Sequence, residues 1–111
     1  MDVVRIQKRL REFATERDWD QYHSPKNLSM ALSVEAAELM EIFQWVGAEE
    51  SRKVIEHPDK VVQVEAEIAD ICIYAIRLAD VMGVDLETAI DRKIDQNIEK
   101  YPPGASRHWS L

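Results

Sequence analysis

The chain has 111 residues, of which 46% are hydrophobic and 32% charged, and its formal net charge is −7. This balance is typical of a soluble globular protein with one domain and excludes a disordered chain. The acidic charge excludes the basic surface that binds nucleic-acid polymers, so a protein of this kind that acts on a phosphate compound needs a cation as intermediary. No run of about 20 apolar residues or signal-peptide region is present, and we expect no membrane partner and a cytoplasmic location.

The hydrophobic periodicity predicts four long helices and no strand. Because the connections between them are short, neighbouring helices are expected to run antiparallel. The predicted fold is an all-α, four-helix bundle-like domain over residues 1–103, followed by a flexible tail at 104–111. In chain order, the expected helices span about 2–17, about 25–46, a short segment around 51–55, about 59–82, and from 86 to the break at Tyr101-Pro102.

Capping residues mark the expected ends of these helices. Ser24 precedes Pro25 and is a typical N-cap, since its hydroxyl accepts a hydrogen bond from a backbone N–H of the first turn. Asp85 is placed to do the same for the last helix. Gly47 and Gly83 are expected at the C-terminal ends of the second and third long helices, where glycine tolerates a left-handed backbone. Residues 21–25 are predicted to form a loop.

One carboxylate interrupts the apolar stripe of the second helix. The stripe consists of positions 28, 32, 35, 39, 42 and 46, which are four or three residues apart. Five of these six residues are Leu, Ile or Val, whereas the sixth is Glu35. Glu38 lies one turn further, close to the same face. An acid on the face that packs into the core needs a partner, which makes Glu35 a candidate functional residue. Glu41 follows at the next such step, and a position at the exposed rim is the better interpretation there.

The third long helix carries a similar pair. Its segment 68–76 contains one charged residue, Asp70, among nine, and a helix that is apolar all round is a buried helix. Glu67 lies one turn earlier. Four acids from two packed helices repel one another, and carboxylate oxygens are the natural ligands of Mg²⁺. The sequence therefore predicts a Mg²⁺ site, with Mn²⁺ as a possible substitute, built from Glu35, Glu38, Glu67 and Asp70.

Other interpretations of these features stay open. Acid pairs at this spacing are common on solvated helix faces, and carboxylates also hold two irons in some bundles. Those di-iron sites use Glu-x-x-His on two helices, and both pairs here lack His. Cys72, the single cysteine, lies in an apolar run and is expected to be a reduced structural thiol. A helix that is apolar on all sides needs more cover than one small chain supplies, so we expect an oligomer.

The acids fit the ExxE…ExxD pattern of the MazG-like all-α nucleoside triphosphate pyrophosphohydrolase superfamily, with 28 residues between the two halves. Flanking segments resemble the dCTP pyrophosphatase branch of that superfamily: 18–28, 43–45, 73–74 and 93–102. The resemblance covers about 3–102, except that 48–60 carries none of it. It implies hydrolysis between the α- and β-phosphates, giving a nucleoside monophosphate and pyrophosphate. It also implies a dimer, or a tetramer of two dimers, whose site a neighbouring subunit completes.

Catalytic and binding roles follow partly from chemistry and partly from this resemblance. Glu38 is the candidate to accept a proton from the attacking water, and Glu35 is the other candidate catalytic acid. The chain has no Walker-type glycine-rich loop, so phosphates must be bound by metal and side chains. The resemblance implies that His23 and Trp45 contact the base, while Tyr74 packs under the sugar or hydrogen-bonds Asp70. The expected substrate-binding residues are His23, Lys26, Asn27, Trp45, Tyr74, Lys93, Asn97 and Tyr101.

Three functional hypotheses remain. The first is a house-cleaning pyrophosphohydrolase that prefers dCTP or a modified dCTP. The second keeps the same metal chemistry and changes the substrate to dUTP or another nucleoside triphosphate. The third is a non-catalytic helical module that binds a nucleotide without cleaving it. Metal storage is disfavoured, because the two acid pairs lack accompanying His and too few further acids are expected to join the four as ligands.

Overall fold

The computed structural model describes residues 1–104, and these residues form helices and turns without strands, which confirms the predicted all-α class. The expected tail at 104–111 lies outside the described residues except for Gly104. Within the described part of the chain, no helix has both the length and the apolar composition to cross a membrane. The elements are α1 (Val3–Glu16), η1 (Asp20–Tyr22), α2 (Pro25–Phe43), α3 (Ala48–Ser51), η2 (Val54–Glu56), α4 (Pro58–Met82) and α5 (Leu86–Lys100).

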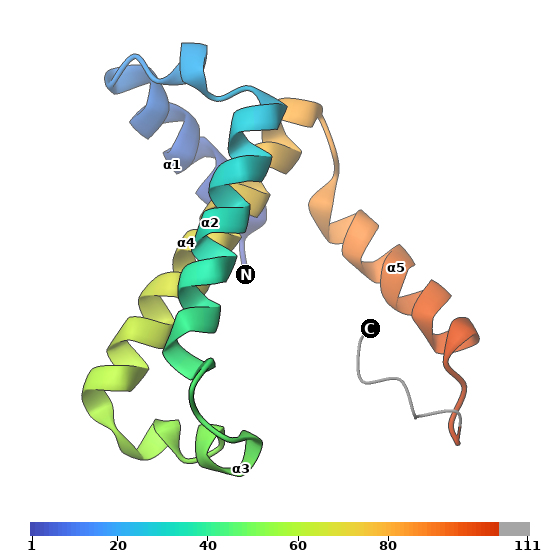
Figure 1. The fold of residues 1–111 in the computed structure, drawn as a ribbon. Coiled ribbons are helices and arrows are strands. Elements are labelled where there is room, and N and C mark those ends of the chain that lie inside the picture. Colours follow the sequence, from blue (N-terminus) through green and yellow to red (C-terminus); the bar gives the residue numbers. More distant parts are fainter. Residues whose placement is uncertain (105–111) are drawn as a thin grey trace.

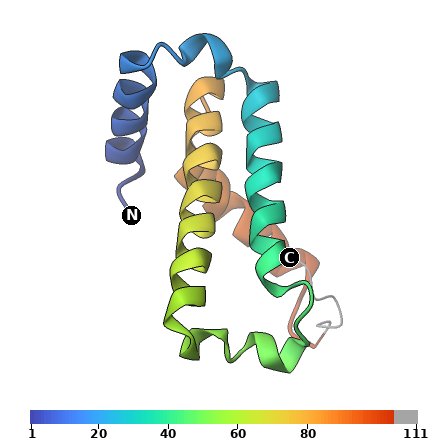
Figure 2. The same ribbon diagram turned by 60° about the vertical axis from the view of Figure 1, so that its left-hand side comes forward.

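The helices α2 and α4 form the centre of the fold. They run antiparallel and side by side, and α1 packs against α4 (Figure 2). The predicted stripe is the buried side of α2: Leu28 is 2% exposed, and Leu32, Leu39 and Ile42 are half-buried. Because Glu35 belongs to this stripe, the packing of α2 on α4 carries its carboxylate toward the interface.

Three of the predicted caps are confirmed. The Ser24 hydroxyl accepts a hydrogen bond from the Asn27 backbone N–H at 3.1 Å, and the Asp85 carboxylate accepts one from the Thr88 N–H at 3.1 Å. Gly83 ends α4 with a φ of 69°, in the left-handed region where a glycine is favoured. These caps set where α2 and α5 begin and where α4 ends.

The expected role of Gly47 is wrong. The helix α2 ends at Phe43, and the Val46 N–H donates to the Phe43 carbonyl in a tightening turn, so Gly47 instead precedes α3 with a φ of −65°. The predicted short helix around 51–55 is replaced by two shorter turns, α3 and η2. The loop predicted at 21–25 likewise begins within a 3₁₀ turn, η1.

The last helix, α5, stands away from the others. It diverges from α2 and α4 (Figure 1) and makes few contacts with them. Its apolar residues Ile90, Ile94 and Ile98 are 47%, 49% and 62% exposed. The radius of gyration is 16.8 Å, against about 13 Å for a compact domain of this length. The accessible surface is 8846 Å², against roughly 6300 Å² for a self-contained monomer of this mass. The chain alone therefore leaves apolar surface uncovered.

Replacing Leu28 by Ala should lower the free energy of unfolding by about 3 kcal/mol, because Leu28 is 2% exposed and its truncation removes buried apolar contacts and leaves a cavity. Urea unfolding at one fixed protein concentration measures the change. The control Lys26→Ala changes an exposed residue close to Leu28 in α2 and should change stability by less than about 0.5 kcal/mol. Equal effects from the two substitutions would show that Leu28 is not a core residue.

Candidate functional site

Three carboxylates converge where α2 faces α4. Glu35 and Glu38 come from α2 and Glu67 from α4, and one oxygen of each lies within 4.8 Å of the others. The spacing of three residues places Glu35 and Glu38 one turn apart, and the antiparallel packing brings Glu67 opposite them. Glu35 and Glu67 are half-buried, whereas Glu38 is exposed. The arrangement matches the acid cluster predicted from the sequence for these three residues.

The cluster is electrostatically uncompensated. Atoms Oε2 of Glu35 and Oε2 of Glu67 are buried and have no hydrogen-bond partner. The pKa of Glu35 is raised, chiefly by the adjacent Glu67 carboxyl and then by burial, and that of Glu38 is raised chiefly by the adjacent Glu35 carboxyl. Buried acceptor oxygens without donors fit a divalent cation, because Mg²⁺ takes carboxylate oxygens as ligands. These three residues therefore suit a divalent cation.

Asp70 occupies a different place from the other three acids. It lies one turn beyond Glu67 on α4 and is half-buried, and its charge contributes to the raised pKa of Glu35. Its carboxylate does not belong to the group that lies within 4.8 Å. Asp70 instead lines the neighbouring cavity, so it connects the acid cluster with that cavity.

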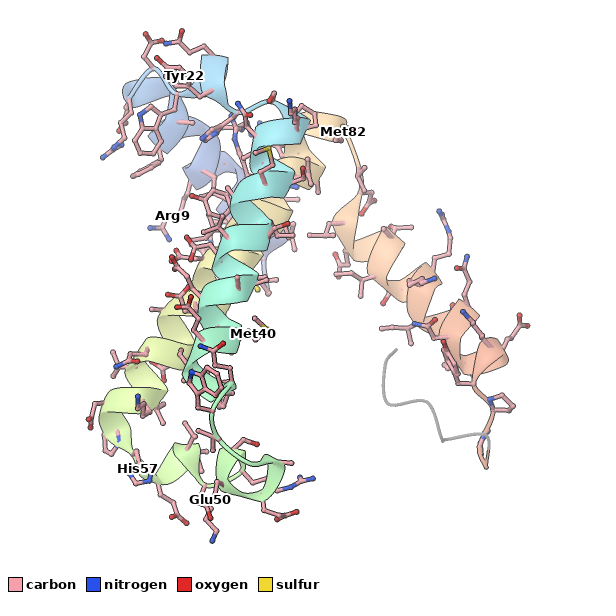
Figure 3. The ribbon with its side chains drawn as sticks, in the orientation of Figure 1. Arg9, Tyr22, Met40, Glu50, His57 and Met82 are labelled. Carbon is pink, nitrogen blue, oxygen red and sulfur yellow. The ribbon has the colours of Figure 1, made fainter. Side chains whose placement is uncertain are left out.

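The cavity has a volume of about 600 Å³, a size typical of small-molecule sites. It lies where α1 and the α1–α2 connection meet α4. Two of its aromatic rings, Phe13 and Trp19, pack edge to face with centroids 5.4 Å apart. Arg9 lines it from α1, on the side of the molecule remote from α5 (Figure 3). The lining residues are Arg5, Ile6, Arg9, Leu10, Phe13, Trp19, His23, Asp70, Ile73, Tyr74 and Arg77.

An arginine that the sequence interpretation missed lies at the base of this cavity. Arg77 is 7% exposed, and its Nε donates to Nδ1 of His23 at 3.1 Å while Nη2 donates to Asp20 at 2.8 Å. The pKa of His23 is lowered, first by burial and then by the Arg77 charge, against an opposing effect of Asp20. The signal was present in the sequence, because Arg77 continues the face of Asp70 and Tyr74 after the apolar run ends.

Of the expected substrate-binding residues, the structure brings His23 and Tyr74 together with Asp70 around the cavity. Lys26 is exposed in the first turn of α2. The Asn27 side chain donates to the Tyr22 carbonyl at 2.9 Å, so within this chain it holds the α1–α2 connection.

The remaining expected residues lie away from the cavity in the single chain. Trp45 follows the opposite end of α2 and is 90% exposed. Lys93 and Asn97 belong to α5, the helix that diverges from the bundle, and Tyr101 directly follows it. Within one chain, therefore, these residues are not brought to the acid cluster.

A second, shallower hollow opens beside the acid cluster. Glu38 and Glu67 line it together with Glu41, Lys60 and Gln63. Glu41 is exposed there, as expected for a rim position. Lys60 and Gln63 were not singled out from the sequence, because one lysine and one amide near the start of a long helix resemble ordinary surface residues.

The metal-free protein should lose stability as the pH rises from about 4.5, the ordinary carboxyl value, toward neutrality. The pKa values of Glu35 and Glu38 are raised by folding, so the folded protein holds protons that the unfolded chain releases across this window. Thermal melting in chelator at stepped pH measures the effect. The difference between wild type and Glu35→Gln isolates the cluster from other carboxylates, and a difference that is constant with pH would contradict the prediction.

The sequence is similar to a known family and to curated proteins. The sequence model of the MazG-like family matches residues 30–109. The chain is 42% identical over 96 residues to dCTP pyrophosphatase 1 of Rattus norvegicus, 44% over 96 residues to that of Bos taurus, and 40% over 99 residues to that of Homo sapiens. These alignments cover 86%, 86% and 89% of this chain and 56%, 57% and 58% of the relatives. The chain thus spans a little over half the length of the curated relatives it matches.

The fold is also similar to a solved structure. A pyrophosphatase from Archaeoglobus fulgidus superposes with a TM-score of 0.79 at 45% sequence identity, and the match covers 86% of this chain and 87% of that one. The family match extends over most of the chain and includes the three residues of the acid cluster. The chain therefore belongs to the MazG-like family.

Proposed function

We propose that this protein is a divalent-metal-dependent nucleoside triphosphate pyrophosphohydrolase, which hydrolyses the bond between the α- and β-phosphates to a nucleoside monophosphate and pyrophosphate. One observation carries the proposal. Three carboxylates, two of them with orphaned buried oxygens, lie beside a cavity of about 600 Å³ to which Asp70 connects them. A nucleotide hydrolase must bind both a charged phosphate chain and a nucleoside. The acid cluster with its cation would serve the first need, and the aromatic-lined cavity would serve the second.

Glu35, Glu38 and Glu67 would hold the metal, with Asp70 as the fourth ligand, and we propose Mg²⁺ as the ion. When bound, this ion supplies neutralisation of the triphosphate charge and a lowered pKa for a coordinated water. The donor set supports a hard cation, because every candidate ligand is a carboxylate oxygen. Within the described residues no His or Cys joins the cluster, which argues against a softer transition metal.

The chain's own residues position the reactants. Glu38 is the exposed member of the cluster, so it is the acid best able to meet a water and accept its proton. Glu35 stands behind it, where its half-buried carboxylate fixes the position of Glu38 and of the cation. Glu38 would accept a proton from the water as the water oxygen bonds to the α-phosphorus. The bond from that phosphorus to the bridging oxygen then breaks, and pyrophosphate leaves.

The cavity would take the nucleoside, and we propose dCTP or a base-modified dCTP as the preferred substrate. The relatives named dCTP pyrophosphatase 1 support this preference. Trp19 and Phe13 supply aromatic faces, and His23 and Tyr74 supply polar groups beside them. Such a site distinguishes bases through hydrogen bonds, because a mismatched base leaves a buried polar group unpaired.

We further propose that the working form is a homo-oligomer, a dimer or a tetramer of two dimers. The apolar face of α5 and exposed residues such as Met40, which projects from α2 toward the side where α5 lies (Figure 3), support a second copy as their cover. In that assembly, α5 or Trp45 of one copy would reach the acid cluster of another. Lys93, Asn97 and Tyr101 would then contact the phosphates or base from the neighbouring subunit.

The test is a panel of canonical and 5-methylated deoxynucleoside triphosphates incubated with Mg²⁺, with pyrophosphate and monophosphate both measured. We expect the two products in equal amounts and the highest kcat/KM for cytosine nucleotides. Release of inorganic phosphate in place of pyrophosphate would contradict cleavage at the α–β bond.

Two variants separate catalysis from binding. Glu38→Gln and Asp70→Asn should remove turnover, whereas Glu65→Gln, an exposed acid of α4 outside the cluster, should not. Stoichiometric nucleotide binding without product would favour the non-catalytic module. A highest kcat/KM for dUTP would keep the chemistry and overturn the substrate preference.

A further inference from the structure

The ion-pair network around Arg77 joins three elements at one wall of the cavity. Besides its contacts to His23 and Asp20, Arg77 lies 3.6 Å from the carboxylate of Asp80, which also pairs with Arg11 of α1 at 3.0 Å. The Thr15 hydroxyl donates to the second oxygen of Asp20 at 3.0 Å. Two carboxylates, each held by a further partner, therefore fix the guanidinium, and the guanidinium in turn contacts the imidazole of His23.

The chemistry of this contact determines where the proton of His23 lies. A guanidinium has five N–H donors and no acceptor, so the imidazole nitrogen that it contacts must carry no proton. That nitrogen is Nδ1, at 3.1 Å from Nε of Arg77. The neutral ring then carries its proton on Nε2, which has no hydrogen-bond partner within residues 1–104. His23 is one of the residues that line the cavity.

We propose that Arg77 is a positioning residue that holds His23 as the neutral Nε2–H tautomer, so that His23 presents a hydrogen-bond donor to the base bound in the cavity. The inference rests on the proposed function for its ligand, since it assumes that the cavity takes a nucleobase. A fixed donor recognises an acceptor on the base, such as N3 of cytosine, and opposes the N3–H of uracil or thymine. Arg77 would act on specificity without touching the substrate's phosphates.

The surroundings of His23 favour the neutral ring. Its pKa is lowered by burial and by the charge of Arg77, because protonation would break the bond to Nε and place two cations together. Asp20 opposes this shift from η1, but it already accepts from Arg77 and Thr15. The other charged residues that line the cavity, besides Arg77, are Arg5, Arg9 and Asp70.

Long-range ¹H–¹⁵N correlation spectra of the uniformly labelled full chain, recorded without nucleotide, test the tautomer directly. The chain has three histidines, and the spectrum of His23→Gln identifies the His23 signals by their absence. We expect a bare Nδ1 and a protonated Nε2 in the wild type, with the Nε2–H form favoured at least about tenfold. A protonated Nδ1 in the neutral ring would overturn the proposal without any further variant.

Arg77→Met removes the donor, and the tautomer ratio of His23 should then approach that of a free imidazole. Arg77→Lys, which restores a donor, should partly recover the wild-type ratio. Arg11→Gln is the matched control, because it breaks an ion pair of the same network without contacting His23. If Arg77→Met does not fold, the double variant Asp20→Asn/Arg77→Met removes both partners and carries the same expectation. An unchanged ratio in these variants would overturn the role of Arg77.

Kinetics give a second readout that a structural role alone would not move. In Arg77→Met the ratio of kcat/KM for dCTP over dUTP should fall about tenfold, through KM and with little change in kcat. Failure of the proposed function would appear as no turnover with any nucleotide while the spectra still report an Arg77-dependent tautomer. Failure of this inference would appear as normal turnover with a tautomer or a dCTP preference that is independent of Arg77.

Discussion

Glu35→Gln should lower kcat by about 10³-fold with Mg²⁺ present and, in chelator at neutral pH, raise the melting temperature of the protein. Both effects have one cause. The amide has the shape of the carboxylate but no charge, so the variant loses a metal ligand and also removes a carboxyl group whose ionisation the adjacent Glu67, burial and nearby negative charges disfavour. Differential scanning fluorimetry with and without Mg²⁺, beside initial-rate kinetics, measures the two effects.

The matched control for this variant is again Glu65→Gln, which removes one negative charge from an exposed site of α4. The control should keep both the activity and the rise in melting temperature that Mg²⁺ produces in the wild type, because ligand binding to the folded state alone stabilises it. If Glu35→Gln instead destabilised the metal-free protein, the buried oxygen of Glu35 would have a stabilising partner and the cluster would not be a cation site.

Ile94→Asp should dissociate the proposed oligomer and abolish activity, although every candidate metal ligand lies on α2 or α4. Ile94 is in the middle of the α5 apolar face that this chain leaves uncovered. Burial of such a side chain contributes about 1.5–3 kcal/mol, and twofold symmetry places the change in the interface twice, so the dissociation constant should rise roughly 10²- to 10⁴-fold. Sedimentation velocity over a dilution series measures it.

Adding the same charge to the opposite face of α5 tests whether the effect is specific to the apolar face. Gln96→Asp places the carboxylate on the opposite face, where it is exposed and should leave both assembly and activity unchanged. A wild-type protein that sediments as a monomer at all concentrations would contradict the oligomer. Loss of activity in Ile94→Asp without dissociation would place the α5 face in the site of its own chain.

The helical stripe of α2 was enough to predict the acid cluster from the sequence. A single charged residue in an otherwise apolar row must face the helix neighbour, and Glu35 does so with one oxygen buried. The partner helix followed from the same reasoning, and Glu67 meets Glu35 and Glu38 there. Periodicity is reliable for such residues because a helix fixes the direction of each side chain within one turn.

The environment of α4 could not be predicted in the same way. An apolar run around Asp70 suggested burial on all sides, yet Cys72 is free and exposed in the chain, as are Ile68 and Ile73. A hydrophobic pattern indicates that a helix face is buried, but it does not indicate which other surface packs on that face. No local spacing in the sequence identifies what covers these exposed apolar residues.

Arg77 illustrates a second limit. Its contacts with Asp20 and His23 span more than fifty positions of sequence and depend on how the α1–α2 connection folds over α4. That connection contains a 3₁₀ turn where a loop was expected. Long-range polar contacts of this kind follow from tertiary geometry, which residue spacing does not encode.

The divergence of α5 has a consequence for local unfolding. A helix of 15 residues is marginal in water without tertiary packing, and few contacts hold this one to the rest of its chain. Amide protons of α5 should therefore exchange with solvent as a separate cooperative unit, at a rate that falls as protein concentration rises, whereas those of the α2–α4 pair should be protected even on dilution. The exchange rates of the α5 amides would therefore report on the proposed assembly.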